Sequence, residues 1–164
     1  DALVLEDDIF LPDDFVINLN ASLKELRARP DAGPPAACIS LENSGLKQVT
    51  EAHANCTPYR RDQPRETGAY WLNRAAAARF LRTAETQKVS LRTPLFIASE
   101  ARSGAVELWW RHPAIAEQGS VNGRFDSMLD PKRTGPMRRP RWLARKWFQL
   151  HLRPVIDRLR GLPQ

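Results

Sequence analysis

The order of apolar and polar positions along the chain predicts alternating strands and helices. Apolar runs over residues 2–5, 36–41 and 67–73 have the length of short strands. Apolar residues recur at helical spacing between residues 15 and 26, and an Ala-rich segment over 74–87 favours a second helix. This alternation predicts an α/β domain in which helices cover a sheet.

Both predicted helices carry recognisable start signals. Pro12, Asp13 and Asp14 precede the first helix; proline suits a first turn, and the two acids favour the positive end of the helix dipole. Pro30 ends this helix, and Asn73 is placed to cap the second one. The positions predicted to be buried are Phe15, Val16, Leu19, Leu23 and Leu26 in the first helix, and Ala77, Phe80, Leu81 and Ala84 in the second.

The remaining segments give weaker signals. Residues 93–99, which contain Pro94, are predicted to form a strand or a buried segment, and residues 106–110 a strand at the edge of the sheet. The stretch 47–63 shows no clear period, so we expect a long loop or an irregular hairpin there. Pro, Gly and polar residues predict a loop over 112–120.

The first predicted strand runs directly into the acids Glu6, Asp7 and Asp8. Residues 2–5 are all apolar, which predicts that this strand is buried on both faces. Ligands of open α/β sheets bind at the carboxyl ends of the strands, and crowded carboxylates repel one another unless a cation or solvent takes up their charge. Oxygen ligands of this kind suit Mg²⁺ or Mn²⁺, and therefore a phosphate-bearing substrate. The alternative is a solvated corner between strand and loop.

The composition fits one domain of ordinary size. The chain has 164 residues, of which 42% are hydrophobic, enough for a core. No apolar run reaches the roughly eighteen residues that a membrane-spanning helix needs. Cys38 and Cys56 match no zinc-binding spacing, so reduced thiols are expected, with one disulfide as the alternative. The chain starts without Met and almost at once with a strand, so we expect it to lack an N-terminal portion of a larger domain.

Positive charge is concentrated near the C-terminus. Residues 132–160 hold ten Lys or Arg and one acid, a balance of +9, whereas residues 1–131 have a balance of −3. We therefore divide the chain into a domain over 1–130 and a basic, Trp- and Arg-rich helical tail over 131–164, interrupted by prolines. Basic residues beside Trp and Leu favour an anionic membrane surface as the partner of residues 131–160; packing on the domain is the second alternative and nucleic acid the least favoured. The prolines of this tail are Pro131, Pro136, Pro140 and Pro154.

Three segments, in this order, resemble the family 25 glycosyltransferases of bacterial lipopolysaccharide synthesis, relatives of the collagen galactosyltransferases. Residues 3–8 resemble the acidic strand end of that family, and residues 68–77 its Gly-x-x-Tyr strand with the following Ala-rich helix. Residues 112–118, followed by Ser127, resemble its Pro-x-hydrophobic-x-x-Gln…Ser segment. The resemblance implies a GT-A-like, Rossmann-like mixed sheet with flanking helices, here incomplete at its N-terminus.

The resemblance also implies an activity. Family members are expected to transfer galactose from UDP-galactose, or a related sugar, onto a saccharide or glycolipid acceptor. Glu6 and Asp8 would then hold Mn²⁺ or Mg²⁺ against the diphosphate, and Asp7 would contact the ribose or orient a ligand. The location implied is the cytoplasmic face of the bacterial inner membrane, where the protein would be peripheral.

Further site residues follow from the same resemblance. Tyr70, Gln118 and Ser127 would bind the nucleotide sugar or the acceptor, although core packing is an equal alternative for Tyr70. His112 would complete the metal shell or, more commonly for a lone histidine, serve packing. The family usually has an acid where Pro94-Leu95-Phe96 stands here, which leaves Glu100 as the nearest candidate general base.

Two other functions remain open at this point. The nucleotide-binding first half of the family is absent from this chain, so a non-catalytic remnant or interaction module of the same fold is the first alternative. A basic nucleic-acid-binding protein is the second and weaker alternative, based only on the tail.

Overall fold

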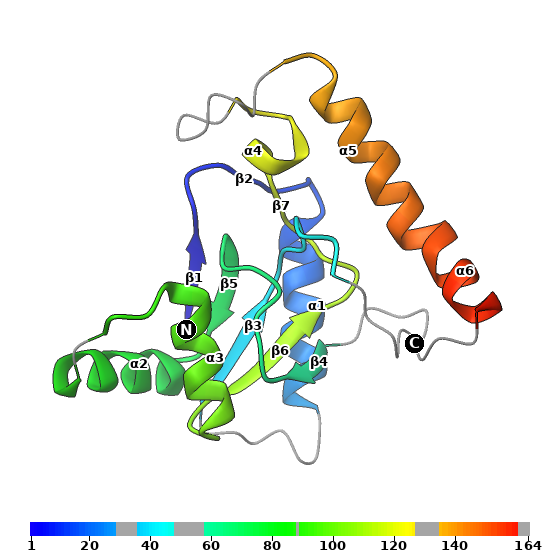
Figure 1. Ribbon diagram of the computed structural model, residues 1–164. Coiled ribbons are helices and arrows are strands. Elements are labelled where there is room, and N and C mark those ends of the chain that lie inside the picture. Colours follow the sequence, from blue (N-terminus) through cyan, green and yellow to red (C-terminus); the bar gives the residue numbers. More distant parts are fainter. Residues whose placement is uncertain (29–35, 48–57, 88, 127–134, 161–164) are drawn as a thin grey trace.

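The computed structural model describes residues 1–28, 36–47, 58–87, 89–126 and 135–160. A mixed sheet of five strands lies at its centre, in the order β1-β5-β3-β6-β4 (Figure 1). These strands are β1 Ala2–Leu5, β5 Ala69–Leu72, β3 Ala37–Ser40, β6 Glu107–Arg111 and β4 Pro58–Arg61. A second, two-stranded sheet pairs β2 Ile9–Phe10 with β7 Glu117–Gln118.

Helices cover both faces of the central sheet. Helix α1 (Phe15–Arg27) packs on the face that carries Ile39. Helices α2 (Arg74–Thr86) and α3 (Thr93–Arg102) pack on the opposite face, which carries Cys38. Because successive side chains of a strand point to opposite faces, β3 is buried on both sides. The predicted α/β class is confirmed.

The direction of the strands decides which ends meet. β1 and β3 both run antiparallel to β5, and β3 runs parallel to β6. In this register Tyr70 of β5 lies between Val4 of β1 and Ser40 of β3. The carboxyl ends of β1, β3 and β6 therefore lie on the same side of the sheet, together with the start of β5. We call this side, formed by the ends of the strands, the sheet edge.

Two strands form at other places in the sheet than the sequence predicted. β1 is not buried: it is an edge strand whose residues 3–5 are 37% to 40% exposed, because only β5 pairs with it. β6 is not an edge strand, since β4, which forms inside the predicted loop 47–63, pairs with its outer side. An apolar run does not reveal how many neighbours a strand will have.

Two other segments adopt a different structure from the one predicted. Residues 93–102, predicted as a strand or a buried segment, form helix α3, in which Ile97 and Ala98 are buried. Pro94 lies in the first turn, where its missing N–H costs no hydrogen bond. The predicted loop over 112–120 contains β7 and the start of the short helix α4 (Gly119–Asn122), because β7 finds a partner in β2.

Helices α1 and α2 form as predicted, but their buried faces differ in part. Asn73 caps α2 by accepting a hydrogen bond from the Ala76 N–H at 2.8 Å. Ala76 and Thr83 are buried, whereas Leu81 is 63% exposed, and Val16 of α1 is exposed to the same extent. The small side chain of Ala76 lets α2 lie close to the sheet, and Leu81 lies on the outer side of the helix.

The basic C-terminal segment forms one continuous helix (Figure 1). It consists of α5 (Arg138–Trp147), a π-helical turn η1 (Phe148–Leu152) and α6 (Arg153–Leu159). Pro140 and Pro154, predicted as breaks, lie inside it. Each is near the start of an α-helical segment, where proline is tolerated, and the wider turn η1 makes room for the Pro154 ring. Within the described ranges no helix is long and apolar enough to cross a bilayer.

Candidate functional site

The predicted acids lie at the shared edge of the sheet, where β1 and β3 end and β5 begins. The Glu6 N–H donates to the Gly68 carbonyl at 2.8 Å, which joins the end of β1 to the start of β5. A Cβ at Gly68 would lie 2.7 Å from Ile9 Cδ1 and 3.2 Å from Glu42 Oε1. The missing side chain of Gly68 therefore lets Glu42, at the end of β3, approach the same point.

Glu42 is held more firmly than the acids that follow β1. It is fully buried and accepts three hydrogen bonds, from Ser44 N at 3.0 Å, from Ser44 Oγ at 2.6 Å and from Gly68 N at 3.3 Å. Hydrogen bonds to a carboxylate are stronger than those between neutral groups. Glu42 thus fixes both the turn after β3 and the start of β5.

A chain of hydrogen bonds leads from Glu42 to Glu6. Ser44 Oγ, which donates to Glu42, accepts from the Gln118 N–H at 2.7 Å. The side-chain Nε2 of Gln118 then donates to Glu6 Oε2 at 3.1 Å. Two predicted site residues separated by 112 positions, Glu6 and Gln118, are therefore in direct contact.

The acids at this edge act on one another electrostatically. Partial burial raises the pKa of Glu6, and the neighbouring carboxylates of Asp8, Glu42 and Asp7 raise it further. Burial also raises the pKa of Glu66, although Lys47 opposes this effect. The edge is thus a region in which additional positive charge would be stabilising.

Asp8 has the feature most suggestive of a missing partner. Its carbonyl accepts from the Gly119 N–H at 2.7 Å, but its Oδ1 is buried and has no hydrogen-bond partner among the described residues. Asp7 beside it is exposed. A buried carboxylate oxygen without a partner is costly, and a bound cation would offset that cost.

The donor set around Asp8 fits a divalent ion that relies on its substrate for further ligands. In the described part of the chain, no three side chains of His, Cys, Asp or Glu gather as a complete metal site. Mg²⁺ is commonly held by one or two carboxylates together with water and substrate phosphates. Glu6 and Asp8 meet that requirement as a pair, and they do not form an all-protein cage.

A pocket of about 490 Å³ opens on the other side of Gln118. One wall comes from the sheet edge and the other from α5 of the C-terminal helix. Its lining residues are Ser44, Gly45, Glu66, Gln118, Val121, Arg138, Trp142 and Arg145.

Two predicted site residues make their side-chain contacts away from the acids that follow β1. Tyr70 is half-buried and packs against the apolar cluster beneath α2 and α3; burial raises its pKa, with smaller contributions from Cys38 and Glu6. Glu100 is buried in α3, where it accepts from Arg79 Nε at 2.8 Å and from Thr83 Oγ1 at 3.3 Å. Figure 1 shows α3 at the opposite end of the sheet from β2 and β7. Glu100 therefore joins two helices, at a distance from the acids that follow β1.

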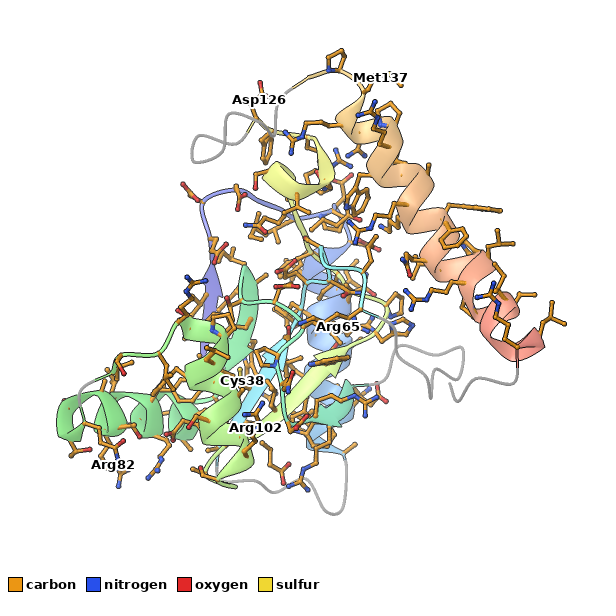
Figure 2. The ribbon with its side chains drawn as sticks, viewed as in Figure 1. Cys38, Arg65, Arg82, Arg102, Asp126 and Met137 are labelled. Carbon is orange, nitrogen blue, oxygen red and sulfur yellow. The ribbon has the colours of Figure 1, made fainter. Side chains whose placement is uncertain are left out.

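The remaining candidates are His112 and Ser127. His112 follows β6 and is 2.9 Å from Arg65, between its Nδ1 and the guanidinium Nη2. Arg65, labelled in Figure 2, is fully buried and also donates to the Arg111 carbonyl at 2.8 Å. Burial, followed by the charges of Arg65 and Arg111, lowers the pKa of His112 to about 4, so its imidazole is neutral at pH 7. Ser127 lies outside the described residues, as does Cys56.

The sequence analysis missed Glu42, Ser44 and the α5 residues of the pocket. A signal for the first two was present, because Glu42 follows a predicted strand just as Glu6 does. The signal needed one further fact, namely that β1 and β3 run in the same direction. The α5 residues line the pocket only because that helix packs against the sheet edge, and no local sequence pattern predicts this packing.

Comparison with known proteins adds no relative: no family model, no curated protein and no solved structure matches this chain.

Proposed function

We propose that this sheet edge is the nucleotide-sugar site of a metal-dependent glycosyltransferase with a GT-A-like fold. The donor would be UDP-galactose or a related sugar nucleotide, and the acceptor a saccharide of the bacterial cell envelope, as in lipopolysaccharide synthesis. One observation carries the proposal: Glu6 is hydrogen-bonded to Gln118 beside a buried Asp8 oxygen that has no partner among the described residues.

In this proposal two of the acids bind the metal ion and a third supports them. Glu6 and Asp8 provide carboxylate oxygens for Mn²⁺ or Mg²⁺, and Gln118 orients Glu6 through its amide hydrogen bond. The bound ion supplies neutralisation of the diphosphate as it leaves. Glu42, buried next to them, adds negative potential that favours a cation.

The acceptor hydroxyl needs a general base, and Asp7 is better placed for this role than Glu100, the residue that the sequence suggested. Asp7 is exposed at the same edge and forms no hydrogen bond within the described segments. Glu100, by contrast, is occupied by Arg79 and Thr83. A base must lie within hydrogen-bond reach of the proton that it removes, so we assign this role to Asp7.

We further propose that the C-terminal helix rests on an anionic membrane surface. Basic residues of the helix, Arg141 and Arg153 among them, would each contribute about 1 kcal/mol near an anionic leaflet. Cosedimentation with phosphatidylserine vesicles but not with phosphatidylcholine vesicles is expected; equal recovery with both would contradict the proposal. The exposed apolar side chains of this helix are Leu143, Trp147, Phe148, Leu150, Leu152, Val155 and Leu159.

The metal site is tested by calorimetric titration of the chain with Mn²⁺. We expect Asp8→Asn to abolish Mn²⁺ binding, because it removes one of the two carboxylates proposed to hold the ion. Asp13→Asn is the matched control, since Asp13 is an exposed aspartate a few residues away and outside the site. Far-UV circular dichroism of both variants checks that they fold. Mn²⁺ binding by Asp8→Asn at wild-type affinity would remove Asp8 as a ligand and favour the non-catalytic alternative.

A further inference from the structure

The pocket between α5 and the sheet edge adjoins the proposed metal site without being part of it. Gln118 belongs to both, because its side-chain amide bonds to Glu6 and the residue also lines the pocket. A volume of about 490 Å³ lies in the range of pockets that hold small ligands. A ligand in this pocket would therefore lie next to whatever binds at the end of β1.

Arg138 gives one wall of the pocket a fixed positive charge. Its guanidinium donates to the carbonyls of Ser120 and Phe125, which hold the side chain in place. Arg138 pairs with the carboxylate of Asp126 at 3.9 Å, and the Asp126 side chain is 80% exposed at the outer end of the molecule (Figure 2). Water screens such a pair strongly, so the charge of Arg138 remains available to the pocket.

Arg145 and Trp142 complete that wall. Arg145 is exposed and makes no hydrogen bond or ion pair with the described residues. Trp142, one turn earlier, is 7% exposed, and its indole Nε1 is buried without a hydrogen-bond partner in the same part of the chain. An aromatic ring beside guanidinium groups is an arrangement that can bind an anionic ring compound.

The acid on the opposite wall is offset in part by a lysine. Glu66 lies 3.8 Å from Lys47 Nζ, and Lys47 is itself fixed by a 3.2 Å hydrogen bond to the Pro64 carbonyl. The pocket lining therefore carries two arginines against one acid, and the Glu66 carboxylate can accept hydrogen bonds from hydroxyl groups. Guanidinium groups favour phosphate, which they contact through paired N–H donors.

The close approach of α5 to the domain keeps this wall in position. Gly123 has a φ of +76°, and a Cβ there would lie 2.6 Å from the Arg139 backbone nitrogen. Glycine at this position thus lets the first turn of α5 pack against α4. Farther along, Lys146 forms an ion pair with Glu117 of β7.

We propose that this pocket binds the phosphate group of a phosphorylated saccharide, with Arg145 and Arg138 contacting the phosphate and Trp142 and Glu66 facing the sugar. That the saccharide is the acceptor rests on the proposed function, whereas binding of the sugar phosphate does not. A sugar nucleotide also carries phosphate, so the experiment must separate the two sources.

The test is calorimetric titration of the full chain in EDTA with glucose 6-phosphate, and with glucose as the neutral control. Glucose 6-phosphate is expected to bind and glucose is not. Arg145→Gln should weaken binding about tenfold or more, because a charged hydrogen-bonding partner is lost. Arg145→Lys should restore part of the affinity, and Arg141→Gln, on the same helix but outside the pocket lining, should have no effect. Equal binding by the wild type and Arg145→Gln, or equal binding of glucose and its phosphate, would overturn the proposal.

In a second experiment, the protein is first saturated with UDP in the presence of Mn²⁺ and is then titrated with glucose 6-phosphate. This titration shows whether the pocket binds the phosphate of the acceptor or that of the sugar nucleotide. Unchanged binding of glucose 6-phosphate supports the acceptor assignment, and its displacement by UDP overturns that assignment. The Asp8→Asn variant separates the proposed phosphate pocket from the proposed metal site. It should lose Mn²⁺ binding and keep glucose 6-phosphate binding, so failure of the metal site leaves the phosphate pocket intact, and failure of the pocket leaves the metal site intact.

Discussion

Strands β1 and β3 look alike in sequence and differ in almost every structural respect. Each is a four-residue strand that runs in the same direction and is followed by acids at the same edge of the sheet. β3 has a neighbour on both sides and helices on both faces, and Ile39 is completely buried. β1 has one neighbour, and its Leu3 is 40% exposed.

The acids that follow the two strands differ in the same way. Glu42, after β3, has its carboxylate occupied by three hydrogen bonds from the protein. Glu6, after β1, is exposed and bonds to one side-chain amide. The buried strand therefore supplies the acid that holds the edge together, and the exposed strand supplies acids that remain accessible to a ligand.

Truncation of an apolar residue in each strand should have very different effects on stability. Ile39→Ala should lower the free energy of unfolding by about 3–4 kcal/mol, because it removes buried methylene groups and leaves a cavity. Leu3→Ala, at an exposed position, should lower it by less than about 1 kcal/mol. Urea denaturation followed by circular dichroism measures both values. Equal losses would mean that β1 is covered in solution.

Neutralising the two acids should shift stability in opposite directions. Glu42→Gln should cost about 2 kcal/mol, because the new amide nitrogen cannot accept a hydrogen bond from Ser44. Glu6 has a raised pKa, so its stabilising contribution is present below the ordinary Glu pKa and is lost as pH rises through the folded-state pKa. Glu6→Gln mimics the protonated form and should therefore raise stability slightly at pH 7 and leave it unchanged near pH 4.

Urea denaturation of both variants at pH 7 and near pH 4 measures these changes in the free energy of unfolding. Destabilisation by Glu6→Gln at pH 7 would show that its bond to Gln118 outweighs the repulsion from Asp8, Glu42 and Asp7. A neutral effect of Glu42→Gln would contradict the structural role that we give to Glu42.

The sequence was sufficient to predict the elements whose formation depends on a local pattern. It was insufficient to predict which elements would lie next to each other. β3, β5, α1 and α2 were predicted because apolar spacing and the Asn73 cap are local signals. The exposure of β1 and the interior position of β6 depend on sheet order, which is set by contacts far apart in the chain. α3 was missed because a short apolar segment with Pro94 is compatible with either a strand or the first turn of a helix.

The residues of the candidate site also fall into those that the sequence predicted and those that it did not. Glu6 and Gln118 were selected through family resemblance, and the structure brings them into hydrogen-bond contact. Glu42 escaped attention because its importance depends on the parallel direction of β1 and β3. The pocket residues Trp142 and Arg145 were read as part of a tail, since only the packing of α5 brings them to the sheet edge.

Paramagnetic broadening by Mn²⁺ tests most directly whether a divalent ion binds at the end of β1. In a ¹⁵N-resolved spectrum of the chain, substoichiometric Mn²⁺ should first broaden the backbone amide of Gly119, which bonds to the Asp8 carbonyl, and that of Asp8 itself. Amides of α2, at the far end of the sheet, should keep their line widths (Figure 1). Uniform broadening, or broadening that begins elsewhere and persists in Asp8→Asn, would contradict the account.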